Sequence, residues 1–146
     1  MGDIMQNTTE ILSSMLKTTQ MGQVGIRVVM PYAARADLKK ALTSQLKEYD
    51  EIEREVYSIA SSRGLDIKEL DPMAKMMSKA YAHANLTFGN IDSKIAAMMI
   101  QGNTRGMIKN LKSQHHGIKD DAGVSSLLQK LLNCEEANIQ QMQGFV

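Results

Sequence analysis

Apolar residues recur at alternating spacings of four and three between positions 37 and 63 of the chain. This spacing places them along one side of a helix, where they form the contact seam of a helical bundle. Charged residues occupy the faces between them. The seam positions are Leu38, Leu42, Gln45, Tyr49, Ile52, Val56 and Ile59. The pattern predicts a helix over 37–63, which Gly64 ends as a C-cap glycine.

The same rhythm predicts three further long helices, over 7–30, 92–115 and 123–143. Pro31 ends the first of them, because proline disfavours helical geometry in the residue before it. The stripe on the first helix consists of Leu12, Leu16, Thr19, Gln23, Ile26 and Met30. The stripe expected on 92–115 consists of Ile95, Met98, Gln101 or Gly102, Arg105, Ile108 and Leu111. The stripe on 123–143 consists of Val124, Leu127, Leu128, Leu131, Glu135, Asn138 and Met142.

A shorter helix is expected between the second and third long ones, over 72–88. It opens at Asp71-Pro72, with proline at the first helical position, and the pattern breaks at Phe88-Gly89. Its expected apolar face consists of Met73, Met76, Met77, Ala80, Ala84, Thr87 and Phe88. No strand-like alternation occurs. We therefore predict an all-α fold with one domain over 1–146, in which a crossover containing the short helix joins two antiparallel hairpins.

Composition excludes several classes of function. Lys and Arg number 17 and Asp and Glu 16, a net charge of +1 without a long run of either sign, so we expect no nucleic-acid and no membrane partner. No apolar run approaches the roughly 18 residues that a membrane span needs. The single cysteine, Cys134, excludes an internal disulfide and favours a reducing, cytoplasmic location.

Polar residues interrupt the apolar stripe of each long helix. They are Gln23, Gln45, Gln101, Arg105, Glu135 and Asn138. Counted from the helix ends, they fall at similar heights if the crossover returns the chain to the end where it began. Isolated buried polar groups destabilise a fold unless they bond one another, so we expect one interior polar layer in which Arg105 neutralises Glu135.

Two hairpins, a long crossover and an interior polar layer resemble the ferritin-like superfamily, in particular its small bacterial members of uncharacterised function, over roughly 7–145. The resemblance implies a di-iron motif of one Glu from each of two helices and Glu-x-x-His from each of the other two. In this chain the two single glutamates fall on Gln23 and Gln101. The last-helix pair becomes Glu135-x-x-Asn138.

The second-helix pair becomes either Gln45-x-x-Glu48 or Glu48-x-x-Glu51, and neither contains histidine. Amides bring no charge to an iron site. The metal-ligand candidates that remain are Glu48, Glu51 and Glu135. We therefore expect a degenerate di-metal site and no cofactor, with an iron- or manganese-binding centre as the alternative.

These observations favour a non-catalytic bundle that acts by self-association, with a dimer as the expected oligomer, or by binding another protein. The expected contact surface is the methionine cluster of Met73, Met76 and Met77, because flexible methionines adapt to protein partners. The alternative is a metal-binding or oxidase-like protein of the ferritin family. The glycines within the helices suggest a third possibility, a cavity for a small apolar ligand, and they are Gly22, Gly25 and Gly102.

Overall fold

The computed structural model describes residues 2–117 and 121–146, and the regular elements within these ranges are all helical. They are α1 (Gly2–Val29), the 3-10 turn η1 (Met30–Tyr32), α2 (Ala36–Ser62), α3 (Pro72–Asn85), α4 (Ile91–His116) and α5 (Ala122–Gln143). The predicted all-α class is confirmed. The bounds agree closely with the predicted ranges, except that α1 already begins at Gly2 and α3 ends at Asn85 rather than at 88.

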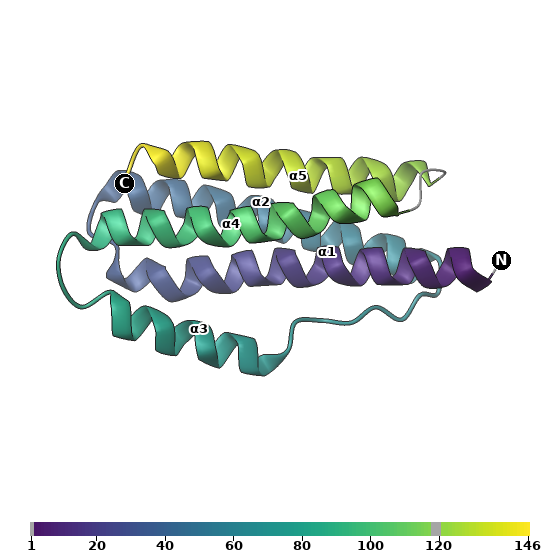
Figure 1. The fold of residues 1–146 in the computed structure, drawn as a ribbon, viewed down its shortest axis with the longest axis horizontal. Helices are drawn as coiled ribbons and strands as arrows, with labels where there is room; N and C mark the ends of the chain where they lie inside the picture. The colour runs from purple at the N-terminus through teal and green to yellow at the C-terminus, as the bar shows by residue number, and fades with distance from the viewer. Residues whose placement is uncertain (1, 118–120) are drawn as a thin grey trace.

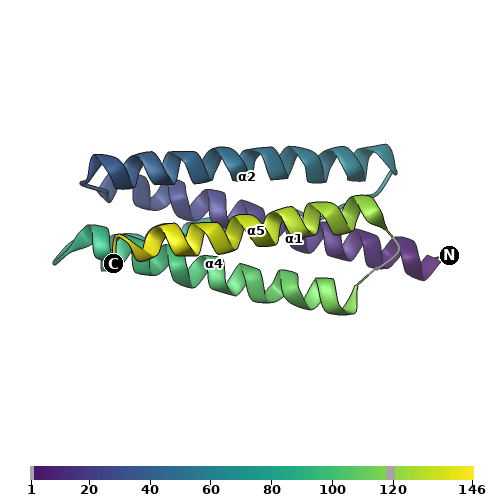
Figure 2. The ribbon, with the colours of Figure 1, turned by 90° about the horizontal axis from the view of Figure 1, so that it is seen from above.

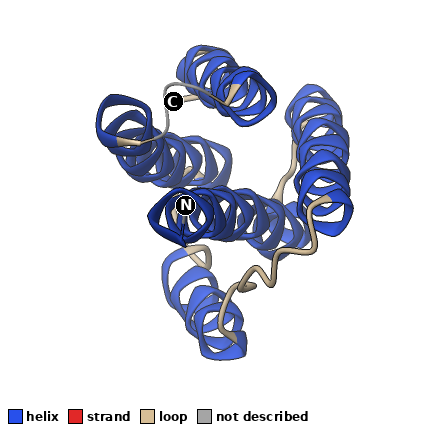
Figure 3. Cartoon of the chain, turned by 90° about the vertical axis from the view of Figure 1, so that its right-hand side faces the viewer, coloured by secondary structure: helices blue, strands red, loops and turns tan. Residues whose placement is uncertain are grey.

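The long helices α1, α2, α4 and α5 lie side by side, and α3 lies outside them against α1 (Figure 1). α1 and α2 run in opposite directions, as do α4 and α5 (Figure 2). The connection through α3 returns along the length of the molecule, so α2 and α4 point the same way. Seen from the end, α1 lies between α3 and the remaining helices (Figure 3). α1 is therefore the element against which all the others pack.

The stripes predicted on α1, α2 and α5 form the core. On α2 every seam position is buried except Ile59, which is half-buried. On α5 the whole predicted stripe is buried, and on α1 all of it except Met30. A fully buried leucine such as Leu16 or Leu42 contributes about 1.5–3 kcal/mol relative to an exposed one. These stripes, together with Ile95, Ala96 and Met99 of α4, form the apolar core of the bundle.

The face predicted to be apolar on α3 does not pack inward. Met73, Met76 and Met77 are 64%, 71% and 67% exposed, and Phe88 is 80% exposed. Ala82 is the buried residue of this helix. Small side chains allow α3 to approach α1 closely, which leaves the longer methionines on the solvent side. The sequence left open how this helix packs; it lies against α1 with its three methionines on the surface.

Acidic and amide side chains fix the helix starts. Asn90 caps α4, because its Oδ1 accepts a 3.2 Å hydrogen bond from the Ser93 N–H. Asp92 serves another purpose: its two carboxylate oxygens accept from the backbone N–H groups of Ala34 and Arg35, at 2.8 and 3.0 Å. This carboxylate ties the turn between α1 and α2 to the beginning of α4.

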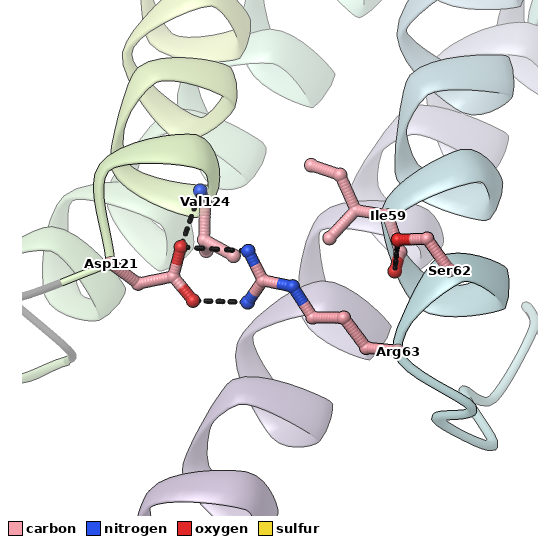
Figure 4. A network of polar contacts seen from close by, with 5 residues as sticks. All are labelled: Ile59, Ser62, Arg63, Asp121 and Val124. Carbon is pink, nitrogen blue, oxygen red and sulfur yellow. Dashed lines mark hydrogen bonds and ion pairs between the residues drawn. The ribbon is translucent and has the colours of Figure 1, made fainter.

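An ion pair joins the opposite end of the bundle (Figure 4). The guanidinium of Arg63, at the end of α2, donates to both carboxylate oxygens of Asp121. The same carboxylate caps α5 by accepting from the Val124 N–H at 3.2 Å. The hydrogen bonds from Arg63 hold the pKa of Asp121 below its usual range. The two hairpins are thus joined at both ends of the molecule.

Candidate functional site

Glu135 is a buried carboxyl on which α1, α4 and α5 converge. Its side chain is 2% exposed. Oε1 accepts a 2.6 Å hydrogen bond from Nδ2 of Asn110 on α4, and the same amide donates to Oγ1 of Thr18 on α1 at 3.3 Å. Oε2 occupies the space that a side chain at Gly106 would fill. No described residue donates a hydrogen bond to Oε2.

Burial raises the pKa of Glu135 to about 7, because the ionised form loses its hydration, and the hydrogen bond from Asn110 opposes this shift only in part. Arg105 was expected to neutralise this carboxyl, and that prediction is wrong. Arg105 is exposed, and its described neighbours include no ion-pair partner. The carboxyl therefore exists partly in its neutral form at neutral pH.

A second polar cluster surrounds the Tyr49 hydroxyl. It donates to Oδ1 of Asn103 at 2.5 Å and accepts from Nδ2 of Asn138 at 3.3 Å. The Cys134 thiol lies 3.7 Å from the same amide nitrogen and donates to Glu48 at 3.3 Å. Burial raises the pKa of Tyr49, and that of Cys134 to about 12, with nearby carboxylates adding to the shift. Both groups stay protonated at neutral pH, which leaves the thiol a weak nucleophile.

The buried glutamines do not join either cluster. Nε2 of Gln23 donates to Oδ1 of Asp50 at 2.8 Å. Nε2 of Gln45 donates to Oε1 of Gln141, also at 2.8 Å. Burial of both glutamines agrees with the predicted seams. The interior polar residues nevertheless form separate groups, so the expectation of one common layer is wrong.

The predicted inward face of α4 is also wrong beyond its first turn. Gln101 and Arg105 are exposed. The buried positions are Asp92, Ile95, Ala96, Met99, Asn103 and Asn110. After Ile95 the sequence allows two registers, since the next two candidates are both methionines, and the prediction followed the wrong one. Asn103, Gly106 and Asn110 follow Met99 at spacings of four, three and four, and this pattern in the sequence indicated the correct inner face of α4.

The metal-ligand candidates Glu48, Glu51 and Glu135 do not converge. Glu48 and Glu51 are exposed on α2, and Glu51 lies 3.6 Å from Lys130 in an ion pair. Glu135 faces α4 instead. Within the ranges that the structure describes, no three His, Cys, Asp or Glu side chains are close enough to hold a metal ion. A single chain thus does not assemble these carboxylates into a di-metal centre.

A groove of about 1090 Å³ lies between α1, α4 and the crossover, with Tyr49 and Glu135 at its floor. The α1 side is lined by Thr9, Glu10, Ser13, Ser14, Lys17, Thr18, Met21, Gly22, Gly25, Val28 and Val29. The α4 side is lined by Met98, Met99, Gln101, Gly102, Asn103, Arg105, Gly106 and Lys109. The crossover contributes Asp66, Lys68, Leu70, Ala74, Met77, Ser78 and Tyr81. Its volume is at the upper limit of the range for sites that bind small organic molecules.

Glycines keep this groove open. A Cβ at Gly102 would meet no atom within 4 Å, and one at Gly25 would meet only the end of the Met99 side chain, at 3.9 Å. Neither glycine is therefore required by close packing. Together with Gly22 they are the residues that the sequence singled out for a possible cavity, and all three line the groove.

Two side chains of α1 hold the connector that contributes Asp66, Lys68 and Leu70 to the lining of the groove. Oγ of Ser13 accepts from the Lys68 N–H at 3.0 Å, and Oε1 of Gln20 accepts from the Leu70 N–H at 2.8 Å. Both bonds act on the extended connector between α2 and α3. Because they are spaced along α1, they fix the path of the connector beside the groove.

Comparison with known proteins adds no assignment: no family model matches the chain, and no curated protein or solved structure matches it either. Among the described helices, none is both long enough and apolar enough to cross a membrane.

Proposed function

We propose that this protein is a non-catalytic helical bundle that binds a small, largely apolar molecule in the groove between α1, α4 and the crossover. The observation that carries the proposal is the open space beside Gly25 and Gly102 within a groove of about 1090 Å³. Glycine in the middle of a helix lowers its stability by about 1 kcal/mol relative to alanine. The packing in this structure offers no compensation at these two positions, whereas a ligand would.

The chemistry of the floor supports binding rather than catalysis. Tyr49 and Cys134 are held protonated by burial, and the carboxyl of Glu135 bonds an amide rather than a base or a nucleophile. Of these groups Tyr49 and Glu135 line the groove and can orient a ligand by hydrogen bonding, whereas Cys134 does not line it. The part of the groove lined by Met21, Val28, Val29 and Met98 has the apolar walls that are usual in small-molecule sites.

The direct test fills the groove without damaging the fold. Gly25→Leu and Gly102→Leu place a side chain where the structure has room, and both substitutions improve helix propensity. We expect wild type to enhance the fluorescence of the neutral apolar probe N-phenyl-1-naphthylamine, and each variant to lose at least about tenfold in affinity for it, a change of about 1.4 kcal/mol.

Ala137→Leu is the matched control, because Ala137 is exposed on α5 and does not line the groove. This control should bind the probe as wild type does. Thermal unfolding of all four proteins establishes that the leucines leave the fold intact. Equal probe binding by wild type and both groove variants would refute the proposal.

A second candidate function is self-association of a ferritin-like scaffold. Its support is the arrangement of two antiparallel hairpins joined by a long crossover, together with the exposed methionines of α3. Flexible methionine faces suit protein contacts. The oxidase-like alternative would require carboxylates from another subunit to complete a site around Glu135, because Glu48 and Glu51 face elsewhere.

A further inference from the structure

The groove is polar at one end and apolar at the other. Because α1 and α4 are antiparallel, Thr18 lies beside Asn110 and Gly25 lies beside Met99. The polar end of the groove, near Thr18 and Asn110, is lined by Glu10, Ser13, Ser14, Lys17 and Lys109. The end around the second pair is lined by Met21, Val28, Val29, Met98 and, from α3, Met77 and Tyr81. A molecule that matches the groove therefore has two chemically different ends.

The polar end carries more cations than acids. Its positively charged lining residues are Lys17, Lys68, Arg105 and Lys109, and its negatively charged ones are Glu10 and Asp66. None of these cations forms an ion pair with a described residue. Unpaired cations beside an apolar channel complement an anionic group attached to a hydrocarbon chain.

Glu135 is the one buried acid near this end, and it repels an anion only when it is ionised. Burial raises its pKa to about 7, so the neutral acid is present at neutral pH. The Asn110 amide donates to it, and the Tyr49 hydroxyl and the Cys134 thiol, which interact with it electrostatically, are uncharged at neutral pH.

We propose that the ligand is a single-chain anionic amphiphile of the fatty-acid class, with its acid group among Lys17, Arg105 and Lys109 and its chain along the methionine-lined half. From Thr18 to Val29 the groove follows α1 for about 16 Å, at about 1.5 Å per residue. That length suits an extended chain of about twelve carbons. This inference rests on the proposed ligand-binding function and adds the chemical class of the ligand.

The test compares three twelve-carbon compounds that differ only in the head group: dodecanoate, dodecanol and dodecyltrimethylammonium. Each displaces N-phenyl-1-naphthylamine from the full chain below its micelle concentration. We expect dodecanoate to bind about tenfold more tightly than the ammonium compound. Lys17→Gln/Lys109→Gln should weaken dodecanoate binding about fivefold to tenfold and leave dodecanol binding within about twofold.

Lys39→Gln/Lys40→Gln is the control, because it removes the same charge from the exposed surface of α2, away from the groove. It should leave the affinity for dodecanoate unchanged. Equal loss in both double variants, equal binding of all three compounds, or tightest binding of the ammonium compound would overturn the assignment of an anionic ligand. Those outcomes leave the groove as a binding site, whereas failure of the probe itself to bind would refute the proposed function.

Discussion

Gly22 and Gly25 lie one turn apart on α1, yet their surroundings are opposite. A Cβ at Gly22 would come within 2.6–3.0 Å of three ring atoms of Tyr49, whereas Gly25 has open space beside it. The ring cannot easily move, because its hydroxyl is bonded to Asn103 and Asn138 inside the core. Close packing against Tyr49 therefore explains the glycine at position 22, whereas the glycine at position 25 leaves free volume in the groove.

Alanine substitutions separate these reasons. We expect Gly22→Ala to destabilise the fold by about 1–3 kcal/mol, because it overpacks the core against Tyr49. We expect Gly25→Ala to stabilise it by about 0.5–1 kcal/mol, because alanine restricts the unfolded chain and suits the helix better. Urea unfolding of the two variants measures both effects, with Gly102→Ala as a second stabilising case. A Gly25→Ala variant less stable than wild type would contradict this explanation of the open space.

At the scale of the elements, hydrophobic periodicity was enough to predict the buried face of a helix where that face is largely apolar. On α2 and α5 the buried stripe could be predicted almost residue by residue. On α4 the adjacent Met98 and Met99 supported two registers, and the true inner face contains asparagines and a glycine that hydropathy does not recognise. The burial of Asn103 and Asn110 depends on partners from other helices, so periodicity within α4 could not reveal it.

The crossover was the other element that the sequence could not orient. Methionines at helical spacing are usually core residues, but α3 packs mainly against α1 and buries Ala82 instead. The groove itself was hidden for the same reason. Glycine positions show where space exists, but only the fold shows that crossover residues such as Leu70, Met77 and Tyr81 line the same groove.

The exposed face of α3 gives a prediction at this scale. If it mediates self-association, wild type should dimerise with increasing concentration, and Met73→Lys/Met76→Lys should remain monomeric. Both residues are exposed and lie outside the groove, so neither stability nor probe binding should change appreciably. Sedimentation velocity over a wide concentration range measures the difference. A wild type that remains monomeric throughout would exclude this surface as a self-association site.

For the whole molecule, Glu135 couples stability to pH. Its pKa is raised to about 7 in the folded state, above the unfolded value near 4.3, so the folded state holds the proton more tightly between these values. Stability from this group is therefore greatest below about pH 4 and is lost as pH rises through 7, by about 4 kcal/mol in total. Asp121 acts in the opposite sense, since its lowered pKa favours the folded state as pH rises from acid.

Comparison with Glu135→Gln isolates the contribution of Glu135, because glutamine can still accept from Asn110 but cannot ionise. We expect the stability of the variant relative to wild type to increase by about 2–3 kcal/mol between pH 5 and pH 8. Urea unfolding at the two pH values gives this difference, in which the effects of other carboxyls cancel. Glu136→Gln, an exposed neighbour, serves as the control and should track wild type. Parallel behaviour of the Glu135 variant would show that the carboxyl is solvated.

The open positions at Gly25 and Gly102 have a consequence for how this sequence can change. Replacing either glycine with a larger residue reduces the conformational freedom of the unfolded chain and so stabilises the helix. The new side chain would at the same time occupy the groove. Selection for thermal stability alone would therefore favour larger residues at both positions. The resulting protein would be more stable, and its groove would be filled by side chains. Persistence of both glycines under such selection would reveal that an occupied groove contributes to fitness.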